Sequence, residues 1–266
     1  MAITTAIQLK SKPFLVFLQV SLVILFLQFH ANPVQAQYDN IDELNVLYRH
    51  EKSGFAMLYS DGWGIGYRQG KHITGFKKRM YEVELQVNRK HPKEVKSLNI
   101  LFNNSKRYVY GKLNYLSVLR GGIGIQKVLN DKPYWGGVQV RYYYSGGVSL
   151  GFTRPYYLYI INYTDSQYEF YLTDEAYDPD KHYISDIYGR GPFGKGFGKI
   201  KIHPGIYGKF AFNFEFGEYQ QEIRSLEVGI IVDAYLEPIP IMAYDTNKQY
   251  NISLFVSIHF GKRFNK

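Results

Sequence analysis

One stretch near the end of the chain, residues 250–260, constrains the fold more than any other. Its alternate positions are apolar: Tyr250, Ile252, Leu254, Val256, Ile258 and Phe260. Four of the five residues between them are polar, so a strand here has one apolar face and one mostly polar face. Its 11 residues are enough for a tilted strand to cross a bilayer. The stretch therefore predicts the closing strand of a membrane β-barrel, followed by a short basic tail at 261–266.

The N-terminal 36 residues have the features of a secretory signal peptide. Lys10 and Lys12 precede a mainly apolar run at 14–29, and Val34-Gln-Ala36 follows as a small-residue cleavage site. The alternative is a retained membrane anchor, but the run is short of the ~20 apolar residues of a spanning helix. We therefore expect cleavage after Ala36 and export of the mature chain.

The charge and composition of the mature chain agree with a surface location. Removing the two lysines of the signal from 32 Lys+Arg leaves 30 against 23 Asp+Glu, a net charge of +7. For an exported protein this favours contact with outer-membrane lipid and lipopolysaccharide phosphate rather than nucleic acid. There is no cysteine, and the 26 tyrosines suit the aromatic girdles of a membrane barrel.

The same alternation of apolar and polar residues recurs along the chain, most clearly at 81–88, 210–216 and 226–235. In a soluble sandwich the apolar faces would pack against a second sheet. That alternative explains less well why the opposite face keeps charged residues in strand after strand, whereas a barrel in lipid has an apolar outside and a polar inside. We predict an all-β protein, a transmembrane antiparallel up-and-down β-barrel.

The expected number of strands is about ten, within a range of 8–12, because single-chain bacterial barrels have even numbers. The predicted strands are 54–60, 62–69, 79–89, 107–118, 122–129, 136–145, 147–162, 206–217, 223–236 and 250–260. Tight turns are expected at Arg120-Gly121 and Gly146-Gly147, and a local break at Pro155. Residues 37–53 are expected to be a periplasmic lead-in, the barrel to occupy 54–266, and 164–205 to be a long extracellular loop with room for a short hairpin.

Four runs resemble a family of small outer-membrane β-barrel proteins of Bacteroidota-type bacteria, a family that is largely uncharacterised. They are GKLNYLSVLRGG at 111–122, YWGGVQVRY at 134–142, PIMA at 240–243 and HFGKRFN at 259–265. The resemblance covers most of the mature chain. It implies the barrel fold and a bacterial outer-membrane location, and it supplies no catalytic residues.

Charged residues on the predicted inward faces form the main candidate site, a lumen charge network. Its members are Arg68, Glu82, Glu84, Lys112, Arg141, Lys209, Glu215, Glu227 and Asp233. Because a barrel of eight to ten strands is nearly filled by its own side chains, we expect these charges to pair and plug the interior. The alternative is a narrow pore or ligand cavity lined by the same groups.

Catalytic and metal chemistry have weaker candidates. Ser253, Ser257 and His259 face inward on the last strand with Asp233 on the preceding one, but near the periplasmic end, away from outer-leaflet lipid A. His203 is a single loop histidine. Gly189–Gly194 matches G-x-G-x-x-G but lacks the strand-to-helix context. The acidic loop residues Asp174, Glu175, Asp178 and Asp180 fit no calcium-loop spacing. No catalytic, cofactor-binding or metal site is therefore expected.

The function predicted from these patterns is non-enzymatic: a structural, binding or envelope-complex accessory role in the outer membrane. Expected partners are membrane lipid and lipopolysaccharide, the barrel-assembly machinery and an envelope protein complex. A narrow channel for small solutes and an outer-membrane lipid-modifying enzyme are the alternatives.

Overall fold

The computed structural model describes residues 48–99, 102, 105–131, 137–164, 170–216 and 221–265. The predicted signal peptide and most of the predicted lead-in lie outside these residues. Within the described part, no helix has the length and hydrophobicity of a membrane span, and the one helical element is a single 3₁₀ turn, η1 (Phe197–Lys199).

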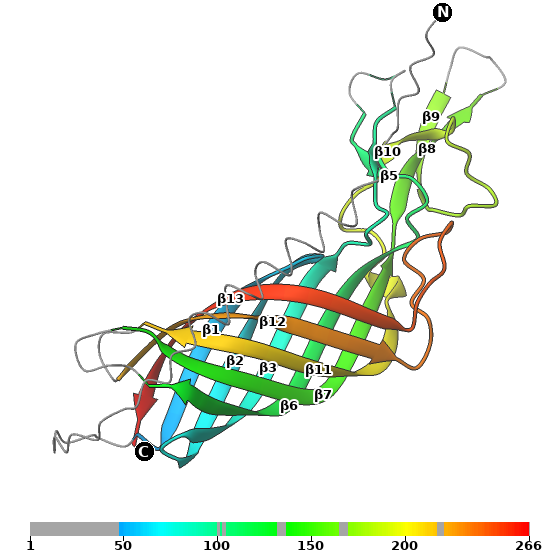
Figure 1. Ribbon diagram of the computed structural model, residues 1–266. Helices are drawn as coiled ribbons and strands as arrows, with labels where there is room; N and C mark the ends of the chain where they lie inside the picture. Colours follow the sequence, from blue (N-terminus) through cyan, green and yellow to red (C-terminus); the bar gives the residue numbers. More distant parts are fainter. Residues whose placement is uncertain are drawn as a thin grey trace, which may run out of the picture. The chain divides into compact units, whose positions relative to one another are not determined.

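Eight strands form a closed barrel, in which each strand is antiparallel to both neighbours (Figure 1). They are β1 (His50–Tyr59), β2 (Gly62–Thr74), β3 (Lys77–Arg89), β6 (Asn114–Asn130), β7 (Gln139–Pro155), β11 (Lys201–Glu215), β12 (Glu222–Tyr235) and β13 (Tyr250–Phe264). Barrel neighbours follow one another in the chain, and β13 closes the ring against β1. The predicted all-β, up-and-down barrel is confirmed, with eight strands rather than about ten.

The strand count differs because the two predicted turns, Arg120-Gly121 and Gly146-Gly147, lie in the middle of strands β6 and β7. Gly122 on β6 pairs with Gly147 on β7. A Cβ on Gly147 would lie 2.2 Å from the Gly121 carbonyl oxygen, and one on Gly122 would lie 2.5 Å from the Tyr207 hydroxyl. These glycines permit close approach within the wall instead of reversing the chain. The predicted strands 107–118, 122–129, 136–145 and 147–162 therefore correspond mainly to the two long strands β6 and β7.

Other strand boundaries also differ from the predicted ones. β1 begins at His50, inside the predicted lead-in, and β13 runs to Phe264, so most of the predicted basic tail is strand. The break at Pro155 is confirmed, because β7 ends there and β8 (Tyr157–Tyr163) joins a separate three-stranded sheet with β9 (Phe170–Ala176) and β10 (Ile187–Arg190). The predicted loop at 164–205 thus contains β9, β10 and the start of β11. The short strands β4 (Lys96–Ser97) and β5 (Tyr108–Val109) form a third sheet.

Side chains alternate between the two faces of the barrel wall as predicted. On β13, Leu254 is 63% exposed on the outside while the next residue, Phe255, is 2% exposed on the inside. Phe210 and Phe212 on β11 also face outward. The long connections at 90–113, 156–200 and 236–249 leave the barrel at the end opposite the chain termini, whereas the connections at the terminal end are short.

Candidate functional site

Arg120 on β6 lies at the centre of the barrel interior and is fully buried. Its Nε and Nη2 atoms donate to the two carboxylate oxygens of Asp233, each at 2.7 Å. Nη1 donates to Glu84 at 2.9 Å, and Nη2 also donates to Gln86 at 2.7 Å. One guanidinium thereby links three strands across the lumen, which is the bidentate geometry that arginine favours.

A second arginine continues the network toward the chain termini. Arg68 donates to Glu227 at 2.7 Å and to Glu82 at 3.0 Å. Lys209 bonds both Glu82, at 3.3 Å, and Glu84, which joins this group to that of Arg120. All these side chains are buried, so each charge is neutralised by neighbours rather than by water.

A third cluster fills the terminal end of the lumen. Arg141 and Arg263 both pair with Glu215, and Arg263 also lies 3.4 Å from Glu51. Lys78 donates to Glu51 at 2.6 Å. The void lined by residues of this region measures about 10 Å³, room for about one water molecule.

The structure brings together eight of the nine residues of the predicted lumen charge network; Lys112 is the exception. Lys112 precedes β6, donates to Glu94 at 2.6 Å and lies over the Tyr115 ring. Burial lowers the pKa of its amino group, although Glu94 opposes this shift. The prediction is wrong here because the range 107–118 is not one barrel strand: the short strand β5 and a turn come first, and β6 begins only at Asn114.

The sequence reasoning missed several members of the network: Glu51, Lys78, Arg120 and Arg263. Glu51 and Arg263 lie in the segments read as lead-in and tail, and Arg120 lies in a segment read as a turn. Each continues the inward parity of its own strand, so extending the alternation through the glycine pairs would have found Arg120.

The end of the barrel away from the termini is closed by the β12–β13 connection. Ile239, Ile241 and Met242 are buried against inward-facing residues of β6 and β12, namely Leu116, Val118 and Tyr235. The Leu113 N–H donates to the Ile241 carbonyl at 2.8 Å, which holds this connection to the start of β6. A Cβ on Gly151 of β7 would lie 3.3 Å from Ile239, so this isoleucine fills space inside the wall.

The three long connections fold onto one another, and we call their described residues (within 90–113, 156–200 and 236–249) the loop module. A buried cluster joins β5, β8 and β10 through Tyr108, Tyr156, Leu158, Ile160, Tyr177 and Ile187. The hydroxyls of Tyr177 and Tyr244 lie 3.4 Å apart, and the Ala243 N–H donates to the Gly111 carbonyl at 2.7 Å. The loop module thus has its own apolar core.

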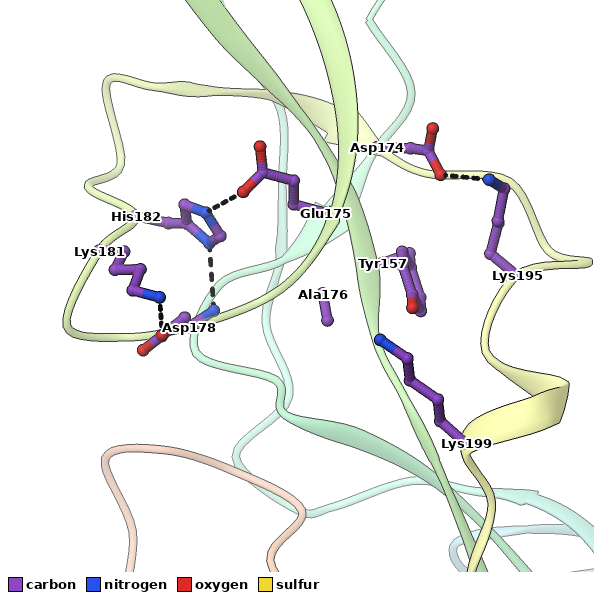
Figure 2. A pocket seen from close by; sticks show the side chains of 9 residues that line it. All are labelled: Tyr157, Asp174, Glu175, Ala176, Asp178, Lys181, His182, Lys195 and Lys199. Carbon is purple, nitrogen blue, oxygen red and sulfur yellow. Dashed lines mark hydrogen bonds and ion pairs between the residues drawn. The ribbon is translucent and has the colours of Figure 1, made fainter.

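The loop module contains a cleft of about 410 Å³, shown in Figure 2. Its polar lining comes from Asp174, Glu175, Asp178, Lys181, His182, Lys195 and Lys199, with Tyr157 as the aromatic member. Lys195 lies 3.0 Å from Asp174, and this hydrogen bond raises the pKa of the lysine. The Asp178 N–H donates to His182 Nδ1 at 3.1 Å, so Nε2 is left to donate to Glu175 at 3.3 Å.

Three of the four acidic residues considered for calcium, Asp174, Glu175 and Asp178, line this cleft and pair with Lys195, His182 and Lys181. Asp180 lies outside the lining and donates its backbone N–H to Asp178. Among the residues that the structure describes, no cluster of three or more His, Asp or Glu side chains is arranged to hold a metal ion. The cleft is lined by ion pairs between acidic and basic side chains.

The candidates for catalysis are sealed inside the wall. Ser257 and His259 are within hydrogen-bond distance at 2.9 Å, but both are buried and His259 packs 4.7 Å from the Phe55 ring. Asp233 is occupied by Arg120, and Ser253 accepts from Asn251. His203 lies near the start of β11, with its Nε2 atom 2.9 Å from the hydroxyl of Thr153 on β7. The structure does not bring these groups into one site.

No family model matches the chain, and no curated protein sequence is significantly similar to it. Solved structures that resemble it include Ail, the attachment invasion locus protein of Yersinia pestis, in complex with the heparin analogue sucrose octasulfate, at 6% identity and a TM-score of 0.38. The match covers 82% of this chain and 100% of Ail. Neisserial surface protein A matches at 9% identity and a TM-score of 0.36, over 82% of this chain and 97% of its own. Likenesses at this level show no family and carry no functional inference.

Proposed function

We propose that the chain is a non-enzymatic binding protein of the bacterial outer membrane, inserted by the barrel-assembly machinery, with a loop module that presents the polar cleft to the outside. The observation that carries this proposal is the contrast between the barrel lumen and the loop module. The lumen is filled by paired charges and capped by Ile239, whereas the loop module contains an open cleft. Conduction needs an open interior, and the candidate catalytic residues Ser257 and His259 are buried inside the wall, whereas binding needs only the cleft.

Membrane insertion is supported by the closed barrel and its apolar exterior. A closed ring leaves no strand edge unpaired, which is a requirement of any sheet in hydrocarbon. Because the barrel has an even number of strands, both termini lie on one side, the periplasmic side in single-chain barrels, and the loop module lies on the outer side.

The absence of native cysteine allows a direct test of this orientation. Lys181→Cys places a thiol in the loop module at an exposed position, and Phe76→Cys places one in the short β2–β3 turn, also exposed. With a membrane-impermeant maleimide, we expect Lys181→Cys to react in intact cells and Phe76→Cys to react only after lysis. Equal labelling of both thiols in intact cells would overturn the proposed location.

The channel alternative is tested by conductance in planar bilayers. We expect the wild-type protein to show no open-state current, because ion pairs and the Ile239 cap obstruct the lumen. Replacing Ile239 and Ile241 with Gly removes the cap but keeps the Arg120 network, so that variant is expected to remain closed. Stepwise currents from the wild-type protein would favour the solute channel instead.

Ligand binding is tested with the purified protein on arrays of surface glycans and extended peptides. We expect binding that the double variant Lys195→Ala/Lys199→Ala weakens at least tenfold, because it removes both ammonium groups from one side of the cleft. The matched control, Lys96→Ala/Lys248→Ala, removes the same charge from exposed positions outside the cleft lining. Equal loss in both variants would assign the effect to net charge and not to the cleft.

A further inference from the structure

The outer face of the barrel carries a band of basic side chains near the chain termini. We call it the basic belt; its members are Lys52, Lys71, Lys77, Arg79, Lys127 and Lys262. They come from β13, β1, β2, β3 and β6, which are consecutive around the barrel. Four are exposed and two, Lys77 and Lys127, are half-buried. The belt therefore follows one continuous arc of the wall.

The register places like charges directly opposite one another. Lys52 pairs with Lys262, Lys71 with Arg79, and Lys77 with Lys127. Pairs of this kind destabilise a sheet unless something neutralises them. Three such pairs in one arc point to a negatively charged partner outside the chain.

Among the described residues, the outward carboxylate opposite a belt residue is Glu222, which faces Lys262 across the β12–β13 pair but lies 2.9 Å from Arg224. None of the six belt residues forms an ion pair with a described carboxylate. The nearby inward carboxylates are already used: Glu51 by Lys78 and Glu215 by Arg141 and Arg263. Those interactions lie on the other face of the wall, so the belt retains its charge.

The belt lies at the terminal edge of the continuous apolar band, with only Ile73 and Leu129 as outward apolar residues beyond it on β2 and β6. On β13 the outward residues run from Tyr250 to Phe260, and Lys262 is the next outward residue. On β3, Arg79 is the next outward residue after Tyr81 in the direction of the chain termini. On β6, Lys127 is the next outward residue after Ile125 in the same direction. A barrel in a bilayer would hold these cations at the level of the lipid headgroups, with their aliphatic stems along the hydrocarbon boundary.

We infer that the basic belt binds the phosphate groups of anionic phospholipid in the membrane leaflet on the side of the chain termini. The inference rests on the proposed membrane location. Cations near an anionic surface are each favoured about fivefold, so six of them concentrate anionic lipid along this arc. The bound phosphates also relieve the three like-charge pairs, which links lipid binding to the stability of the barrel.

The test uses the full mature chain in nanodiscs of equal phosphatidylglycerol and phosphatidylcholine, with retained lipids identified by native mass spectrometry. We expect the wild-type protein to retain phosphatidylglycerol preferentially. The variant Lys52→Gln/Lys71→Gln/Lys262→Gln removes three belt charges, one from each of three adjacent strands, and should lower that preference more than fivefold. The control Lys96→Gln/Lys106→Gln/Lys248→Gln removes the same charge from exposed loop positions and should keep it.

The outcomes separate the belt from the membrane proposal. Insertion into pure phosphatidylcholine nanodiscs, seen as heat-modifiable migration, is expected of both variants and of the wild type. Insertion with no phosphatidylglycerol preference in the wild type, or with the same preference in the belt variant, would overturn the belt alone. Failure of the wild type to insert into any lipid would overturn the membrane location itself.

Discussion

Arg120→Ala is expected to lower the free energy of unfolding by about 3–5 kcal/mol, the largest effect of any single substitution in the lumen. The substitution leaves Asp233 and Glu84 as buried carboxylates that have lost their shared cation. Equilibrium unfolding in urea, with the protein in lipid vesicles and tryptophan fluorescence as the signal, measures the change.

The controls for Arg120 separate its charge from its volume. Lys181→Ala removes a basic side chain that is largely exposed, and a change within about 0.5 kcal/mol is expected. The double variant Arg120→Met/Asp233→Leu replaces a cation and one carboxylate by apolar groups, and it should recover part of the loss. A cost below about 1 kcal/mol for Arg120→Ala would show that the network is dispensable.

Val256→Arg is expected to cost about 2–4 kcal/mol, because it places a cation on the outward face in the middle of the apolar band. The same substitution at Tyr250, on the same face at the edge of the band, is expected to cost about 0–1 kcal/mol. Folding into phosphatidylcholine vesicles, followed by heat-modifiable migration and urea unfolding, measures both.

This pair of variants also tests the choice between a membrane barrel and a soluble protein. In water, an arginine on an exposed face would cost little at either position. Equal and small effects at 250 and 256, together with a mature chain that stays in solution without detergent, would contradict the membrane barrel.

The alternation of side chains could be read from the sequence because it is a local property of an extended chain. Two faces of different polarity are visible in residues 81–88 and 250–260 without knowing any partner strand. Closure followed from the same pattern, since an open sheet cannot leave its edges unpaired in lipid. The inward position of most of the candidate charges followed from parity within each strand.

The alternation of side chains within a strand could not show the role of the glycines. Arg120-Gly121 and Gly146-Gly147 look like turns in isolation, because glycine is common where a chain reverses. In the structure Gly122 pairs with Gly147 across β6 and β7, where the absent side chains make room for Tyr207 and for the neighbouring backbone. That reason exists only once two distant segments have been brought side by side.

The sequence by itself determined the all-β class, the two-faced wall and the inward position of eight candidate charges, because each depends on neighbours along the chain. Tertiary structure alone decided the number of strands, the pairing of Arg120 with Asp233, the position of Lys112 beside Glu94 and the insertion of Ile239 into the mouth of the barrel. These depend on register and on which side chains meet across the lumen. The contacts join residues far apart in the chain, so no local pattern encodes them.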